Sequence, residues 1–169
     1  MADHQVIVVV GSNRGVGRGI VQLLANQQLH RPLTIYATSR SGIDSSINIL
    51  SPSRVLYREL DIANPSSIHL FFESALEEHG AIDVLINNAA VSNDHQKTPD
   101  LAAEMVWTNY GGTRDMCKAF LAQPTIRPGA RIINMTSGYN RLQDYSPELQ
   151  ELFRDADDSN ALDELAAAY

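Results

Sequence analysis

One stretch near the start of the chain constrains the fold more than any other, because an apolar run there ends directly at a glycine-rich turn. Residues 6–10 are all β-branched, which is typical of a strand buried on both faces of a parallel sheet. Ile20, Leu23 and Leu24 follow at helical spacing. A strand, a glycine turn and a helix in this order predict the first βα unit of a doubly wound domain. The turn has the sequence Gly11-Ser12-Asn13-Arg14-Gly15-Val16-Gly17.

The rest of the chain repeats this alternation of apolar runs and amphipathic stretches. Further strands are predicted at residues 33–38, 54–60, 82–86 and 131–135. Helices are predicted from Asn64-Pro65 to Gly80, over residues 101–121, after Ser146-Pro147, and over residues 161–168. Strands that alternate with helices imply βαβ crossovers. We therefore expect a Rossmann-like α/β fold, with a parallel sheet of about five strands in the order 3-2-1-4-5.

The length of the chain, 169 residues, predicts a single domain. Residues 1–137 carry all the predicted strands. Residues 138–169 contain no strand pattern and are expected to form a helical appendage to the sheet. Trp107 and the phenylalanines are expected to pack in the core.

Composition argues against several classes of function. The formal net charge is −7, whereas nucleic-acid binding requires a dense basic face. No apolar run is long enough for a signal peptide or a membrane span. Cys117 is the only cysteine, so no intrachain disulfide can form and a reducing, cytoplasmic setting is expected. The histidines lack paired ligand spacing, which predicts no metal site; they are His4, His30, His69, His79 and His95.

The glycine turn has the composition that a phosphate-binding loop requires. In such loops one glycine permits the tight turn, one lets the backbone approach a pyrophosphate, and one lets the helix pack closely on the sheet. The free N–H groups at the start of the helix then face the phosphates. Residues 11–17 are therefore predicted to hold the pyrophosphate of a dinucleotide.

The end of the second strand indicates which dinucleotide is bound. Enzymes that use NAD usually carry an acid there, which binds the ribose 2′-hydroxyl. In this chain no acid follows the second strand until Asp44. Arg40 stands at that strand end, and Arg14 lies inside the glycine turn. Two guanidinium groups can chelate a 2′-phosphate, so we expect the cofactor to be NADP(H).

Five segments in order along the chain resemble the short-chain dehydrogenase/reductase family. The glycine turn matches, although Val10 replaces the usual threonine before it. The third and fourth strands are followed by Asp61-Ile62 and by Asn87-Asn88-Ala89-Ala90, where Ala90 replaces the usual glycine. The other two segments are Thr108-Asn109-Tyr110-Gly111-Gly112-Thr113 and Ile132-Ile133-Asn134-Met135-Thr136-Ser137.

The stretch after Ser137 is similar to the helical insertion of the monomeric carbonyl reductases within that family. Within this stretch the similarity lies in Tyr145-Ser146-Pro147-Glu148-Leu149-Gln150 and in Phe153-Arg154. Arg40 and the earlier run Gly112-Thr113-Arg114-Asp115 also resemble these reductases. In a complete version this resemblance implies the reduction of a small carbonyl compound to an alcohol by NADPH.

The resemblance also implies roles for individual residues. Asp61 and Ile62 would meet the adenine, and Asn87, Asn88 and Ala89 would contribute to the cofactor site. Ser137 would donate a hydrogen bond to the carbonyl oxygen of the substrate. Asn109 would kink its helix and order a water molecule for proton relay.

One essential part of the family's machinery does not occur in this sequence. The family's reaction requires a tyrosine followed four residues later by a lysine. The only lysines are Lys97 and Lys118, preceded at that spacing by Asn93 and Arg114. The positions four residues after Tyr36, Tyr57, Tyr110, Tyr139 and Tyr145 hold no lysine, and Tyr169 is the last residue.

Two interpretations of this gap remain open. The chain is either a truncated product of a longer carbonyl reductase, inactive alone, or a short protein that binds NADP(H) without catalysis, as a cofactor sensor or a regulatory partner of a reductase. Strands six and seven of the family also have no counterpart here. The fifth strand, with Ile132 and Ile133, is therefore expected to present an open edge through which the chain self-associates or binds a partner.

Overall fold

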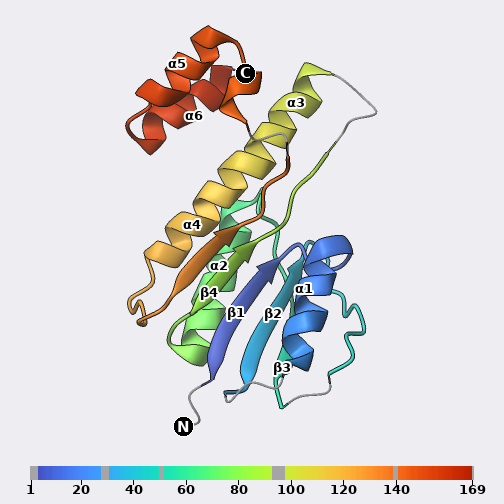
Figure 1. The fold of residues 1–169 in the computed structure, drawn as a ribbon. Helices are drawn as coiled ribbons and strands as arrows, with labels where there is room; N and C mark the ends of the chain where they lie inside the picture. The colour runs from blue at the N-terminus through green and yellow to red at the C-terminus, as the bar shows by residue number, and fades with distance from the viewer. Residues whose placement is uncertain (1–3, 28–30, 50–51, 93–97, 139–140, 169) are drawn as a thin grey trace.

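Five parallel strands form one sheet in the computed structural model, which describes residues 4–27, 31–49, 52–92, 98–138 and 141–168 (Figure 1). The strand order β3-β2-β1-β4-β5 confirms the predicted fold. The strands are β1 (Gln5–Val10), β2 (Leu33–Ser39), β3 (Arg54–Glu59), β4 (Val84–Asn87) and β5 (Arg131–Asn134). The sequence features named above at His30, Asn93, His95, Lys97, Tyr139 and Tyr169 lie outside the described residues.

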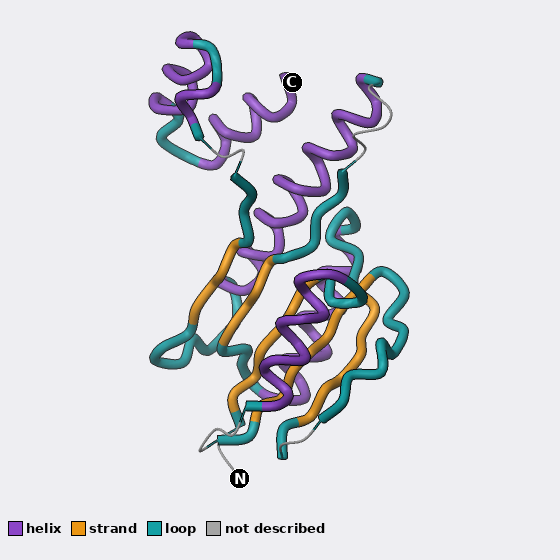
Figure 2. Tube along the Cα trace, turned by 45° about the vertical axis from the view of Figure 1, so that its right-hand side comes forward, coloured by secondary structure: helices purple, strands orange, loops and turns teal. Residues whose placement is uncertain are grey.

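Helices cover both faces of the sheet, and the alternation along β1 shows how (Figures 1 and 2). Ile7 and Val9 pack with α1 (Gly15–Asn26), whereas Val6, Val8 and Val10 face the opposite helices. Those helices are α2 (Pro65–His79) and a continuous helical stretch. This stretch comprises α3 (Pro99–Val106), the π-helical segment η1 (Trp107–Gly112) and α4 (Thr113–Leu121). Both faces of β1 are therefore buried, as the β-branched run predicts.

Helix α2 begins and ends where the sequence predicts. The Asn64 side chain accepts hydrogen bonds from the backbone N–H groups of Ser66 and Ser67, at 3.0 and 3.4 Å. Pro65 occupies the first helical position, where its missing N–H costs nothing. Gly80 closes the helix in the left-handed conformation, with φ 74°, which a residue without a Cβ adopts readily.

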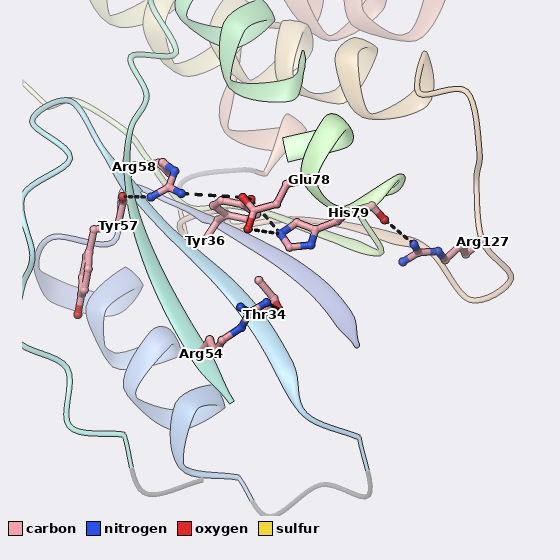
Figure 3. A network of polar contacts seen from close by, with 8 residues as sticks. All are labelled: Thr34, Tyr36, Arg54, Tyr57, Arg58, Glu78, His79 and Arg127. Atoms are coloured by element: carbon pink, nitrogen blue, oxygen red, sulfur yellow. Dashed lines mark hydrogen bonds and ion pairs between the residues drawn. The ribbon is translucent and has the colours of Figure 1, made fainter. Parts of the chain in front are cut away.

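A buried tyrosine ties the end of α2 to the sheet (Figure 3). The Tyr36 hydroxyl donates to Glu78 Oε2 at 2.9 Å and lies 3.0 Å from His79 Nε2. Burial raises the pKa of the Tyr36 phenol, and its contact with Glu78 raises that pKa further. Burial also lowers the pKa of His79. Burial therefore favours the neutral form of both rings, and the Tyr36 hydroxyl remains a hydrogen-bond donor to Glu78.

Asp83 joins the starts of three strands. Its Oδ2 accepts from the backbone N–H of Val6 at 2.7 Å and lies 3.0 Å from Arg127 Nη1. The carbonyl oxygen of Asp83 accepts from the backbone N–H of Arg131, which begins β5. The second Arg127 nitrogen donates to the carbonyl oxygen of His79 at 2.9 Å. One carboxylate thus connects β1, β4 and the loop before β5.

The residues after β5 form the predicted helical appendage, beyond the carboxyl end of that strand (Figure 1). It consists of η2 (Leu142–Asp144), α5 (Pro147–Asp155) and α6 (Ser159–Ala168). Asp163 of α6 accepts hydrogen bonds from the Tyr110 hydroxyl and from Arg114, so α6 is held against η1 and α4. No helix in the described ranges is long and apolar enough to cross a membrane.

The expectation that Trp107 and all the phenylalanines pack in the core is wrong for two of these residues. Trp107 is 51% exposed and Phe153 is 42% exposed, whereas Phe71, Phe72 and Phe120 are buried. The π-helical turn shifts the helical register, so Thr108, Gly111 and Gly112 face inward instead. The indole lies over Gly111 and borders a groove of about 290 Å³ between η1 and α6. Phe153 lies in the small appendage, where it packs beside Tyr145.

Candidate functional site

Most of the predicted site residues lie at or just after the carboxyl ends of the five strands, and parallel strands bring these ends to one edge of the sheet (Figure 1). Asn109 lies in η1 instead. Hydrogen bonds join the loops at this edge. The backbone N–H and the hydroxyl of Ser12 both donate to the carbonyl oxygen of Thr38, at 2.9 and 3.1 Å. The glycine turn after β1 is thus attached to the end of β2, two residues before Arg40. Ligands of open α/β sheets bind in the crevice at this edge.

Close packing explains the last glycine of the turn. A Cβ built at Gly17 would overlap the carbonyl oxygen of Gly11 and lie 2.5 Å from Asn88 Nδ2. That Asn88 nitrogen donates to the carbonyl oxygens of Gly11 and Val10, at 2.9 and 3.2 Å. The Asn88 side chain, from the loop after β4, therefore holds the backbone of the turn in place.

The outer side of the turn is open and suited to an anion. Gly15 has φ 56°, and a Cβ built there would have no neighbour within 4 Å. The Arg14 side chain does not cap α1, and the first turn of α1 contains no acid. The first backbone N–H groups of a helix carry partial positive charge and attract phosphate. These residues fit the pyrophosphate of a dinucleotide, and its binding here stays a prediction.

The two arginines predicted to bind a 2′-phosphate are both exposed at this edge. Neither guanidinium forms a hydrogen bond or an ion pair within the described part of the chain. The nearest acid after β2, Asp44, accepts a hydrogen bond from the backbone N–H of Ser46 at 2.6 Å. Arg14 and Arg40 are therefore available to an anionic ligand.

The pair predicted to meet the adenine is used partly for local structure. Asp61 Oδ1 accepts from the backbone N–H of Ala63 at 3.0 Å, in the turn that leads into α2. Ile62 is 6% exposed and packs against Gly112. A Cβ built at Gly112 would lie only 3.0 Å from the Ile62 side chain. Adenine contact by either residue stays a prediction.

The residues at the end of β4 and just after it contact the glycine turn and β5. Asn87 is buried, and its Nδ2 donates to Asn134 Oδ1 at 2.8 Å and to Cys117 Sγ at 3.4 Å. Asn87 Oδ1 has no partner among the described residues. Burial raises the pKa of the Cys117 thiol, which does not favour its use as a nucleophile. Ala89 packs against Gly11. These contacts position the glycine turn, and direct cofactor contact by Asn87, Asn88 or Ala89 stays a prediction.

The two residues assigned to catalysis have different surroundings. Asn109 lies within the π-helical segment, and its amide pairs with Val91, accepting from the backbone N–H at 2.8 Å and donating to the carbonyl oxygen at 2.9 Å. It therefore fastens the irregular helix to the segment after β4. Ser137 follows β5 and is exposed. The described residues contain no group of three or more side chains suited to a metal ion.

Two residues of α1 that sequence reasoning did not single out contact the segment after Arg40. Arg18 donates through Nε and Nη2 to the carbonyl oxygen of Ser45, and Gln22 donates to that of Asn48. Their targets are main-chain carbonyls, which every residue type presents. No sequence pattern marks such a contact.

The fold and the edge just described define a Rossmann-like α/β domain with a glycine-rich turn at its carboxyl edge. The family model of the short chain dehydrogenases matches residues 5–146. The chain therefore belongs to the short-chain dehydrogenase family.

The chain is also similar to curated proteins that are named carbonyl reductases. The chain is 35% identical over 162 residues to the rat protein carbonyl reductase (NADPH) 1, covering 90% of this chain and 57% of that protein. It is 32% identical over 156 residues to the human protein of the same name, covering 88% of this chain and 55% of that protein. The chain thus spans little more than half the length of these relatives.

Solved structures show the same fold. Menthone neomenthol reductase from Mentha piperita superposes with a TM-score of 0.77 at 21% identity, covering 99% of this chain and 73% of that chain. A short chain dehydrogenase from Burkholderia cenocepacia J2315, solved in complex with NADP, gives a TM-score of 0.66 at 21% identity, covering 85% of this chain and 58% of that chain.

Proposed function

We propose that this chain binds NADP(H) and supplies the cofactor-binding part of a carbonyl reductase. The observation that carries the proposal is the pair of exposed guanidinium groups of Arg14 and Arg40, which have no partner among the described residues. They lie beside a glycine turn at the start of α1, whose N-terminus has no side-chain cap. The similarity to proteins named as NADPH-dependent carbonyl reductases supports it. Because Cys117 is the only cysteine, we also propose a reducing compartment such as the cytoplasm.

In the whole protein the reaction would convert a carbonyl compound and NADPH, with one proton, to an alcohol and NADP⁺. Bound NADPH supplies the hydride. The glycine turn would hold the pyrophosphate, and the two arginines would neutralise the 2′-phosphate. The Ser137 hydroxyl would donate a hydrogen bond to the carbonyl oxygen and increase its polarisation. Asn109 would keep the segment after β4 in place beside the site.

The preference for NADP⁺ over NAD⁺ is the direct test. One charge-assisted contact contributes ~1.5–3 kcal/mol, or roughly one to two decades of affinity. Titration calorimetry should therefore give NADP⁺ the lower Kd by that factor. Arg40→Asp should reverse the preference, because a carboxylate repels the 2′-phosphate and accepts a hydrogen bond from a free ribose hydroxyl.

Arg141→Asp is the matched control, since it makes the same charge change at an exposed position in the appendage. It should leave the ratio of the two affinities unchanged. Equal affinity of the wild-type chain for both cofactors, or a preference for NAD⁺, would contradict the proposal.

A second candidate function is a non-catalytic NADP(H)-binding module, such as a cofactor sensor or a regulatory partner of a reductase. It is favoured by one observation, the lack of any Tyr-x-x-x-Lys sequence in these 169 residues. Both candidates predict cofactor binding. They differ in whether the protein in which this sequence occurs turns over a carbonyl substrate.

We also propose that the isolated chain self-associates through the edge of β5. In the part of the chain that the structure describes, β5 pairs only with β4. Ile133 and Met135 are 42% and 46% exposed at this edge. An open edge with apolar side chains is a template for pairing with another chain. Light scattering after size exclusion should detect dimers or larger species at micromolar concentration.

Ile133→Lys should shift this distribution toward monomer, because a charged edge disfavours pairing. Leu23→Lys replaces an equally apolar, 62% exposed residue of α1 and should not shift it. A monodisperse wild-type monomer with a cooperative melt above ~65 °C, the upper range for mesophile domains, would show that the edge is protected.

A further inference from the structure

The segment after Arg40 is fastened along one side of α1 by two side chains. Arg18 Nε and Nη2 donate to the carbonyl oxygen of Ser45, at 3.3 and 3.1 Å. Gln22 Nε2 donates to the carbonyl oxygen of Asn48 at 2.7 Å. Residues four apart on a helix lie on the same face. Arg18 and Gln22 therefore form a row along which the segment runs.

The same segment is also held from the sheet. Ile47 is 9% exposed and packs in the core between α1 and the strands. Its backbone N–H donates to the Tyr57 hydroxyl on β3 at 3.0 Å. Ile43, in contrast, is 69% exposed. Hydrogen bonds with the side chains of Arg18, Gln22 and Tyr57, together with the buried side chain of Ile47, therefore hold the segment in place. Most of its other residues are exposed.

The other end of the segment is fixed by a tight turn that contains Arg40. The Gly42 backbone N–H donates to the carbonyl oxygen of Ser39 at 3.2 Å and to the Ser39 hydroxyl at 3.1 Å. Gly42 has φ 62°, and a Cβ there would lie 2.7 Å from the backbone nitrogen of Glu59. The Arg40 backbone is thus held between a buried strand end and a fastened segment.

The three arginines near this edge differ in their contacts. Arg18 lies one helical turn after Arg14, with its N–H donating to the Arg14 carbonyl oxygen at 3.2 Å. Its guanidinium is committed to the Ser45 carbonyl, whereas those of Arg14 and Arg40 are not engaged by the described residues. Without the anchors, ligand binding would have to order the segment, and ordering a flexible segment costs conformational entropy.

We propose that Arg18 and Gln22 are positioning residues for 2′-phosphate recognition, because they hold segment 43–48 and thereby preorganise Arg40. This inference rests on the proposed function, since it assumes that Arg40 contacts the 2′-phosphate. It predicts that the loss of either anchor weakens the binding of NADP⁺ and leaves that of NAD⁺ nearly unchanged.

Gln22→Ala is the decisive variant, since it removes an anchor without changing the charge. Its Kd for NADP⁺ should rise about three- to tenfold, the equivalent of one hydrogen bond. Its Kd for NAD⁺ should change by less than about twofold. Gln27→Ala is the matched control, because Gln27 is exposed just after α1, and it should change neither constant.

Conservative replacement and a double-mutant cycle separate this role from general support of the fold. Arg18→Lys keeps the charge and one donor, so it should retain more NADP⁺ affinity than Arg18→Ala. In an Arg40→Ala background, Gln22→Ala should have almost no further effect on NADP⁺ affinity. Equal losses for both cofactors, or an undiminished loss in that background, would overturn the inference.

A measurement without cofactor separates this inference from the proposed function. Hydrogen exchange of residues 43–48 should be faster in Gln22→Ala than in the wild-type chain and unchanged in Gln27→Ala. If the wild-type chain does not prefer NADP⁺, the proposed function fails and the inference fails with it. If the preference is present but Gln22→Ala alters neither exchange nor affinity, only the inference fails.

Discussion

Mixed with NADPH and a quinone or an aromatic aldehyde, the 169-residue chain should oxidise NADPH about 10²–10⁴-fold more slowly than a reductase with the tyrosine–lysine pair. This range is the usual contribution of one positioned proton donor or acceptor. The charge of the lysine, which lowers the pKa of the tyrosine, is also lacking. The loss of absorbance of NADPH in the presence of the carbonyl compound is the measurement.

Three of the described tyrosines are poor substitutes for that donor. Tyr36 and Tyr110 donate to Glu78 and Asp163. Burial and these acceptors raise the pKa of both phenols, so both are weaker acids than free tyrosine. The Tyr57 hydroxyl accepts from the backbone of Ile47. Clear turnover that disappears in Ser137→Ala would contradict this expectation and would require a proton donor of another kind.

The second large effect concerns stability. Asp83→Ala should lower the free energy of unfolding by about 3 kcal/mol, the lower end of the cost of breaking a buried ion pair, because the Arg127 side chain is 34% exposed. Asp83 is 8% exposed, and its removal leaves the Val6 N–H without its acceptor inside the sheet. A loss of this size is a large part of the stability of a typical domain, ~5–15 kcal/mol. Urea unfolding monitored by circular dichroism measures it.

Two further variants make the stability test specific. Asp83→Asn keeps an oxygen that can accept from Val6, so its loss should be smaller than that of Asp83→Ala. Asp157→Ala removes an exposed carboxylate in the appendage and should leave the free energy of unfolding nearly unchanged. If Asp83→Ala unfolds at the same urea concentration as Asp157→Ala, the carboxylate does not have the structural role assigned to it.

The sheet was predictable from sequence because its signals are local. Five β-branched residues in β1 require burial on both faces, and Asn64, Pro65 and Gly80 mark the two ends of α2 through their own conformational preferences. Periodicity alone did not predict the π-helical segment, in which Asn109 pairs with Val91 of the loop after β4; only the family resemblance implied an irregular helix at Asn109. Trp107 was expected in the core because of its aromatic residue type alone, whereas its indole is 51% exposed in this helical segment.

The candidate site could be proposed from sequence where residue type and function are directly linked, and its cofactor contacts stay predictions. Glycines are needed where the backbone turns tightly, and arginines stand where a 2′-phosphate would be recognised. The supporting contacts were not predictable. Asn88 binds main-chain oxygens of β1 and the turn, and Arg18 and Gln22 bind those of a segment more than twenty residues away. Such contacts depend on where the chain returns in space, which residue type alone does not indicate.

A crystal structure of this chain grown with NADP⁺ would test the central claim most directly. We expect the pyrophosphate to lie over residues 11–17, against the start of α1. The 2′-phosphate oxygens should lie ~2.7–2.9 Å from the guanidinium nitrogens of Arg14 and Arg40, the usual length of a charge-assisted hydrogen bond. A cofactor bound elsewhere, or a 2′-phosphate in solvent with both guanidinium groups turned away from it, would contradict the assignment.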